Sequence, residues 1–130
     1  MPSNQILFLS HEDYQTIQSV LSLASAEVAE FLEEELNRAA VLPREELPEG
    51  IIALGDHVHY VDLETKKEFS VVLGLPHETD VASKKISVLS PIGAALIGLK
   101  KGDVIQCPMK NDQVKNIRVL NVESALSETV

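Results

Sequence analysis

The sequence predicts an α+β protein in which a short antiparallel helical hairpin precedes an antiparallel β-sheet that carries one short helix. Three observations lead to this prediction. Apolar residues recur every three to four positions through residues 14–39, as they do along one face of a helix. A stretch with two prolines and a glycine interrupts this spacing at 41–50. Beyond it, apolar and polar residues alternate, which is typical of strands with one buried face.

Two serines mark the expected starts of the helices in the hairpin. Ser10 opens the S-x-x-D pattern of a capping box, so the first helix is expected from about His11 to about Leu23. Ser25 can cap a second helix, whose acids are expected in solvent. The apolar segment QILFL before Ser10 predicts a short strand or a hydrophobic staple. The inward stripe of the second helix comprises Val28, Phe31, Leu32, Leu36 and Ala39.

The segment VLPREELPEG marks the expected domain boundary, because its prolines cannot continue a helix. The predicted organisation is a helical hairpin over 1–42, a linker over 43–50 and a β-domain over 51–130, with a frayed tail from 123 onward.

The β-domain is expected to hold four or five antiparallel strands. Ser90 and Pro91 predict the start of its short helix, since the missing N–H of proline costs nothing at a first helical position. From Ile92 to Leu99 this helix is apolar nearly all round and should be buried. A hairpin turn is expected at Asn111–Asp112. The predicted strands lie near 57–62, 69–75, 86–90, 104–107 and 114–122.

The net charge of −9 is concentrated in the first part of the chain. Residues 1–50 carry ten acids and two bases, giving −8, whereas residues 51–130 carry ten acids and nine bases, giving −1. An acidic surface disfavours binding to a nucleic-acid backbone and favours either solubility or a basic protein partner. A lone Cys107, no signal-peptide pattern and no long apolar run lead us to expect a cytoplasmic protein that does not enter membranes.

The segment ISVLSPIGAALIGLKKGD, residues 86–103, resembles the I-S-V-x-S-P-x-x-x-A-L-x-G-x-x-x-G-D segment of the C-terminal domain of the bacterial Gre transcript-cleavage factors. That domain has the FKBP-like fold. The hairpin and the segment ELNRAAVLPREELPEGII are similar to those of the regulators of nucleoside diphosphate kinase, a branch of the family with a short helical hairpin. The resemblance spans roughly residues 10–122.

The resemblance implies that RNA polymerase is the partner. In Gre factors the C-terminal domain docks at the rim of the secondary channel of the enzyme, and a coiled coil enters the channel. The docking region includes the loop with the Ser-Pro step, which corresponds here to Ser90, Pro91, Ile92 and Gly93. The residues themselves leave two roles open for this corner: a stiff contact surface, or a helix cap alone.

The hairpin departs from the Gre pattern at its tip. Gre factors carry two acids there, which help to hold a Mg²⁺ ion in the polymerase active site. The turn expected here, Leu23–Ala26, has no acid, and the helices look too short for the reach of a Gre coil. The nearest analogue is Glu27 with Glu30, which share a helix face and can also serve the helix dipole or solubility.

The expected function is therefore a monomeric regulator with no catalytic residue, cofactor or metal of its own. It would compete with Gre factors at the secondary channel without stimulating transcript cleavage, and Glu27 and Glu30 are candidate polymerase contacts. One alternative is Gre-like cleavage stimulation through the same two acids. Another is an FKBP-like isomerase or chaperone module, although the chain has only three Phe, two Tyr and no Trp for an aromatic pocket. His57 and His59 could be metal ligands, but a solvent-facing pair explains them more simply.

Overall fold

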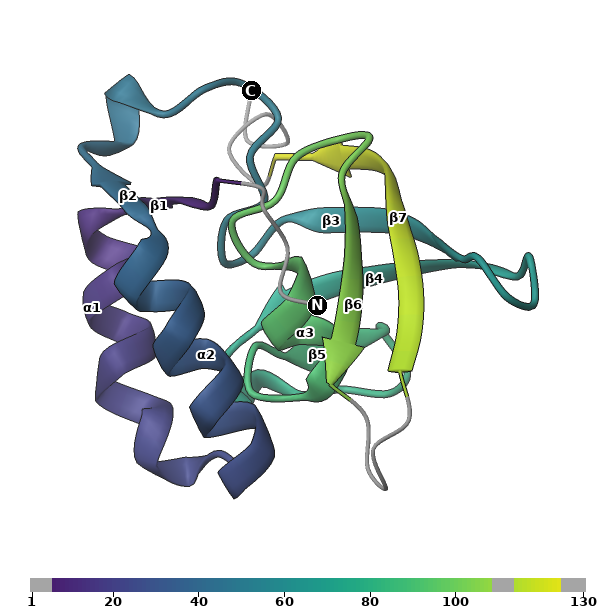
Figure 1. The fold of residues 1–130 in the computed structure, drawn as a ribbon, viewed down its shortest axis with the longest axis horizontal. Helices are drawn as coiled ribbons and strands as arrows, with labels where there is room; N and C mark the ends of the chain where they lie inside the picture. The colour runs from purple at the N-terminus through teal and green to yellow at the C-terminus, as the bar shows by residue number, and fades with distance from the viewer. Residues whose placement is uncertain (1–5, 109–113, 125–130) are drawn as a thin grey trace.

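A five-stranded sheet forms the larger part of the molecule (Figure 1). The computed structural model describes residues 6–108 and 114–124, and it confirms the α+β class. The strand order is β5-β4-β3-β7-β6, with antiparallel pairing everywhere except between β4 and β5, which are parallel. The strands are β3 (His57–Asp62), β4 (Glu68–Gly74), β5 (Lys85–Ser87), β6 (Val104–Pro108) and β7 (Val114–Glu123).

Two helices lie side by side and antiparallel on one side of the molecule (Figure 1). They are α1 (His11–Val20) and α2 (Ala26–Arg38), joined by a 3₁₀ turn at Leu21–Leu23. Each begins at the serine that the sequence indicates. The Ser10 hydroxyl accepts a hydrogen bond from the N–H of Asp13 at 3.0 Å, and the Ser25 hydroxyl accepts one from Val28 at 3.3 Å.

A small parallel pair of strands closes the open end of the two helices. The strand β1 (Phe8–Ser10), one of the two alternatives for QILFL, pairs with β2 (Ala40–Leu42). The second strand was not expected from the sequence, which has only AVL between the helix and the first proline. Three residues carry too little periodicity to reveal a strand whose partner lies 32 positions earlier, at Phe8 for Ala40.

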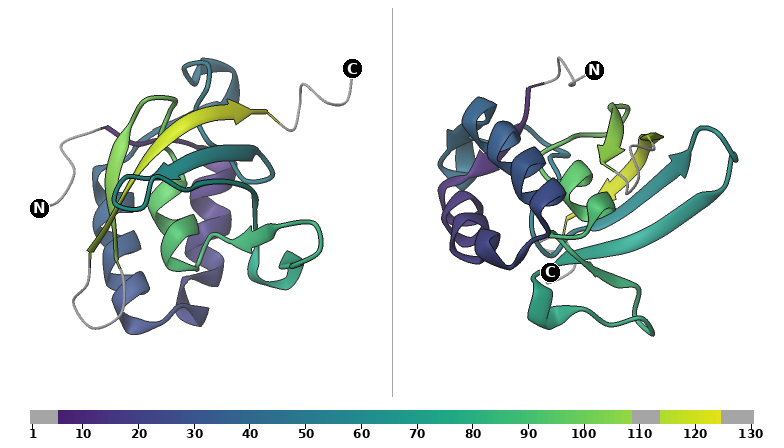
Figure 2. Two further views of the ribbon diagram at one scale, coloured as in Figure 1. Left: turned by 90° about the vertical axis from the view of Figure 1, so that its right-hand side faces the viewer. Right: turned by 60° about the horizontal axis from the view of Figure 1, so that its bottom comes forward.

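One hydrophobic core joins the helix pair to the sheet. The short helix α3 (Pro91–Leu96) contacts both α2 and β6, so it lies between the two (Figures 1 and 2). Leu32 on α2, Leu96 on α3 and Ile117 on β7 are all fully buried members of this core. The expected burial is confirmed for residues 93–99, but the helix itself ends at Leu96 and not at Leu99 as expected. The division of the chain at 43–50 stays a prediction; that segment contains a 3₁₀ turn at Arg44–Glu46.

The third strand differs from the prediction in length and direction. We expected Ile86 to Ser90 in an antiparallel strand, but β5 ends at Ser87 and runs parallel to β4. After Ser87 the main chain turns, with the N–H of Ser90 donating to the Ser87 carbonyl oxygen at 3.0 Å, so the following residues lead into α3. The connection from β4 to β5 contains a 3₁₀ turn at Pro76–Glu78 and brings the chain back beside Val72 of β4, where β5 begins.

The expected turn at Asn111–Asp112 and most of the expected tail lie outside the described residues. In the part of the chain that the structure describes, none of the helices has the length and apolar character needed to cross a membrane.

Candidate functional site: the Ser-Pro corner and the helix-pair tip

The corner between β5 and α3, formed by Ser90, Pro91, Ile92 and Gly93, is built on hydrogen bonds of two serines. The Ser90 hydroxyl accepts from the N–H of Gly93 at 3.1 Å and donates to the carbonyl oxygen of Ser87 at 2.7 Å. The Ser87 hydroxyl accepts from the N–H of Leu89 at 2.9 Å. Together with the fixed φ of proline, these bonds hold the corner in one conformation. The capping role of Ser90 and Pro91 is therefore present in the structure.

Gly93 has a packing role in this corner. It is buried, and a Cβ placed on it would lie 2.1 Å from the carbonyl oxygen of Ser87. Only glycine lets α3 approach the end of β5 so closely. Ser90, Pro91 and Ile92 are half-buried, so any contact of the corner with a partner involves these three side chains rather than Gly93.

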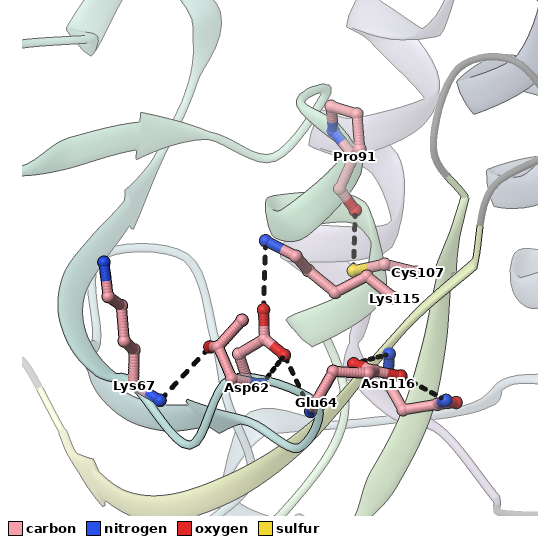
Figure 3. Close-up of polar contacts among 8 residues, drawn as sticks. Asp62, Glu64, Lys67, Pro91, Cys107, Lys115 and Asn116 are labelled. Carbon is pink, nitrogen blue, oxygen red and sulfur yellow. Dashed lines mark hydrogen bonds and ion pairs between the residues drawn. The ribbon is translucent and has the colours of Figure 1, made fainter.

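The first turn of α3 is also fixed from below by the sheet (Figure 3). The Cys107 thiol on β6 donates to the Pro91 carbonyl oxygen, with the two atoms 3.7 Å apart. Burial raises the pKa of this thiol to about 12, so it stays protonated at neutral pH. The thiol was predicted to be an inert core group, and its burial is consistent with that role.

An ion pair between neighbouring strands lies beside this thiol (Figure 3). The ammonium of Lys115 on β7 is 3.3 Å from the carboxylate of Asp62 at the end of β3. Burial alone would raise the pKa of Asp62, but hydrogen bonds from the N–H groups of Thr65 and Glu64 and from Lys115 hold the pKa below its usual value. The carboxylate therefore stays charged and holds the β3–β4 turn against β7.

The tip of the helix pair contains no acid. It consists of the 3₁₀ turn Leu21–Leu23 with Ala24 and Ser25, and its most exposed apolar side chain is Leu23, at 70 %. Glu27 and Glu30 stand exposed on the first turns of α2, close behind the tip. Glu27 lies in the first turn, where a negative charge complements the helix dipole.

The tip and the Ser-Pro corner point toward the same end of the molecule. The N–H of Phe8 donates to the carbonyl oxygen of Gly98 at 3.2 Å, which places the open end of the helix pair beside the C-terminal end of α3. In Figure 1 the turn between α1 and α2 lies toward the bottom of the view, and so does β5, which leads into the Ser-Pro corner.

One acid of α2 departs from the expectation that this helix keeps its acids in solvent. Glu35 is only 4 % exposed and forms an ion pair with Arg38 one turn later. The i, i+3 spacing to Arg38 was the available signal, but it is equally typical of a surface pair. The other four acids of α2 are exposed as expected: Glu27, Glu30, Glu33 and Glu34.

A buried carboxylate that the sequence did not single out ties α1 to the entrance of the sheet. Asp13 is 5 % exposed, accepts a hydrogen bond from the N–H of Leu54 at 3.1 Å and lies 4.0 Å from the guanidinium of Arg44. Burial raises the pKa of Asp13, and the bond from Leu54 and the charge of Arg44 offset only part of that effect. The capping-box position of Asp13 gave no sign of this long-range contact.

The two strand histidines have different surroundings. His57 is exposed, while the ring of His59 lies 2.9 Å from the carboxylate of Glu68 on the neighbouring strand. Among the described residues, no three histidine, cysteine or acidic side chains gather closely enough to hold a metal ion.

Comparison with known proteins connects the corner to a family. The family model for the C-terminal part of the transcription elongation factors GreA/GreB matches residues 47–124, which include the whole sheet and α3. The transcription elongation factor GreA of Thermosipho melanesiensis is 36 % identical over 96 residues, 74 % of this chain and 60 % of that protein. This chain thus spans about 60 % of the length of these curated GreA relatives.

Other relatives match almost from end to end. The regulator of nucleoside diphosphate kinase of Escherichia coli is 27 % identical over 124 residues, covering 93 % of this chain and 91 % of that protein. A solved structure of a prokaryotic GreA/GreB transcription elongation factor from Nitrosomonas europaea superposes with a TM-score of 0.74 at 30 % identity, over 93 % of this chain and all of that one. These relatives are transcription factors or regulators. The chain therefore belongs to the GreA/GreB family of transcription elongation factors.

Proposed function

We propose that the protein is a regulator that binds RNA polymerase at the rim of the secondary channel and competes there with Gre factors without stimulating transcript cleavage. Family membership supports polymerase as the partner. In this proposal residues 51–130 act as an FKBP-like docking domain, 43–50 as a linker and 1–42 as a short coiled coil, in a monomeric cytoplasmic protein.

The docking contact is assigned to Ser90, Pro91 and Ile92, which Gly93 holds in place. Three features support the assignment: the half-exposed side chains, the hydroxyl bonds that fix the corner, and the absence of conformational freedom at Pro91. A surface that is already ordered loses little entropy when it binds.

The observation that carries the absence of cleavage stimulation is the acid-free tip. Delivery of a metal ion to a distant active site needs carboxylates at the leading end of the hairpin. Here the leading residues are Leu21–Ser25, and α2 with its 13 residues is only about 20 Å long. Glu27 and Glu30, which are exposed on α2 behind the tip, instead supply negative charge for contacts inside the channel entrance.

A competition assay tests the docking part of the proposal. Core polymerase is titrated with a fluorescently labelled Gre factor, and this protein is added as competitor. Ile92→Lys and Pro91→Glu should each raise the concentration needed for half-displacement by at least tenfold. Lys101→Glu, an exposed change in the turn before β6, should leave it within twofold. No displacement by the wild-type protein would refute docking at this site.

The exposed pair Glu27 and Glu30 favours one second candidate, Gre-like cleavage stimulation. Their carboxylates lie on one face of α2 at i, i+3 spacing and are both open to solvent. Backtracked transcription complexes incubated with Mg²⁺ and this protein decide between the two candidates. Transcript shortening that disappears in the double variant Glu27→Ala/Glu30→Ala would establish the second candidate, and an unchanged transcript length supports the first.

A further inference from the structure

The outer edge of β4 has an unpaired stretch. Odd-numbered residues of β4 direct their main-chain groups toward β3, since the N–H of Leu73 donates to Asp56 and the carbonyl oxygen of Lys67 accepts from Asp62. The groups of Glu68 and Ser70 therefore face the other way, toward the β5 side. There β5 pairs only with residues 72–74, so none of the described residues pairs with Glu68 or Ser70.

A groove runs along this unpaired stretch. Its volume is about 490 Å³, and it lies between Glu68–Val71 and the connection 79–86, which leaves the sheet and returns as β5 (Figure 2). Its lining is mostly apolar and includes Phe69, which is 38 % exposed, and Val81, which is 91 % exposed. Exposed apolar side chains beside an open strand edge are the two features of a site that accepts an added strand.

Unpaired lysines stand at both ends of the same edge. Lys66 and Lys67 lie in the turn before β4, and Lys84 and Lys85 lie beside Val72; no described carboxylate is within 4 Å of any of their ammonium groups. The groove also holds two acids, Glu68, whose carboxylate lies 2.9 Å from the ring of His59, and Asp80, which accepts a hydrogen bond from the hydroxyl of Ser83. The four lysines and these two acids give the edge a net charge of +2, although the whole chain carries −9.

This arrangement of charges disfavours pairing of the β4 edge with the same edge of a second copy of the chain. Antiparallel pairing of two β4 edges around Ser70 would place the Lys66–Lys67 end of one copy beside the Lys84–Lys85 end of the other, so four pairs of like charges would meet. A segment with acids at its ends and β-branched residues between them meets the opposite charges instead. The distance along β4 from Lys67 to Val72, five residues, is about 17 Å, which sets the spacing of those acids.

We propose that the free edge of β4 binds an extended segment of a partner protein by β-strand addition, and that this segment has an apolar centre flanked by acidic residues. The main chain of the segment pairs with Glu68 and Ser70, an apolar side chain enters the groove between Phe69 and Val81, and its carboxylates meet the two lysine pairs. The surface is separate from the Ser-Pro corner, so it does not depend on the proposed docking to polymerase.

The test uses the ¹⁵N-labelled full-length protein and a capped six-residue peptide, in which two threonines and two valines alternate between terminal glutamates, so that the glutamates are five residues apart. Saturable shifts are expected in the amide signals of Glu68–Val71 and of residues 79–85, together with slower hydrogen exchange of the Ser70 amide. A peptide with lysines in place of the glutamates should bind at least tenfold more weakly, and a peptide with N-methylated valines should not bind.

Variants of the protein complete the test. Lys84→Glu should weaken the peptide at least fivefold, whereas Lys101→Glu, a matched change away from the groove, should keep the affinity within twofold. Ser70→Pro, at an edge position whose N–H is unpaired, should abolish binding while far-ultraviolet circular dichroism stays unchanged. The proposal is overturned by absent shifts at millimolar peptide, by shifts confined to Ser90–Ile92, by equal binding of the N-methylated peptide, or by concentration-dependent shifts of the β4 edge without peptide, which would indicate a second copy.

Discussion

Replacement of Gly93 by alanine tests the packing that holds the Ser-Pro corner. In an ordinary helix this change stabilises the protein by up to about 1 kcal/mol, because alanine has the higher helix propensity. Here the new Cβ would lie 2.1 Å from the carbonyl oxygen of Ser87, and close C···O contacts in proteins are about 3.3 Å. The end of β5 and the start of α3 would therefore have to separate by about 1 Å.

The expected cost follows from three contributions. Forcing an extra methyl group into packed structure costs about 1–3 kcal/mol. The same carbonyl oxygen accepts hydrogen bonds from the N–H and the hydroxyl of Ser90, at 3.0 and 2.7 Å, and weakening them costs about 1 kcal/mol more. After subtraction of the helix-propensity gain, the free energy of unfolding should fall by about 2 kcal/mol.

Urea unfolding followed by circular dichroism measures this change, and the midpoint temperature should drop by about 6–8 °C. Gly74→Ala is the matched control, because Gly74 is also buried but its Cβ would meet only the flexible side chains of Glu78 and Lys85, at 3.1 Å or more. The control should change the free energy of unfolding by less than about 1 kcal/mol. A Gly93→Ala protein as stable as the wild type, or more stable, would show that the approach to Ser87 does not constrain the corner.

Three further predictions concern buried titratable groups. The raised pKa of Asp13 means that the folded state holds its proton more tightly than the unfolded state, so this group makes stability fall as the pH rises from about 3.9 through the folded-state pKa. Asp13→Asn keeps an acceptor for the N–H of Leu54 and loses only the 4.0 Å contact with Arg44. The free energy of unfolding measured in urea at pH 7 should therefore change by less than about 1 kcal/mol, and that pH dependence should disappear. A loss of more than about 2 kcal/mol contradicts this account of the site. Asp62 behaves in the opposite sense, because its lowered pKa contributes stability that is lost as the pH falls below about 3.9. Asp62→Ala should speed amide hydrogen exchange at Glu64 and Thr65, because the carboxylate accepts hydrogen bonds from both N–H groups. Cys107, with a pKa of about 12, should not react with Ellman's reagent at pH 8 until urea unfolds the chain, and rapid labelling of the native protein would contradict its burial.

Local chemistry explains why the helix starts could be predicted. Ser10, Ser25 and Ser90 each cap the helix that follows. Each capping hydrogen bond joins residues three positions apart, so a short stretch of sequence is enough to predict it. The buried character of α3 was likewise visible in its uninterrupted apolar residues. The motif around Ser90 also led to the correct family.

Contacts between distant segments escaped prediction for the converse reason. Glu35 and Glu34 are neighbours of the same type, yet only Glu35 faces the protein, since the rotation of α2 against the rest of the molecule decides which acid is covered. The hydrogen bond between Asp13 and Leu54 joins residues 41 positions apart, and the sequence around Asp13 does not indicate it.

The sequence by itself determined the composition of the two parts of this protein, the residues that begin each helix and the absence of an acid between Leu21 and Ser25. Only the tertiary structure decided that β5 runs parallel to β4, that Gly93 touches the end of that strand and that Ser70 remains at an open edge. The physical reason is that alternation and capping act within a few residues. Strand direction and edge exposure depend instead on the path of the connection 75–84, which decides where β5 pairs with β4.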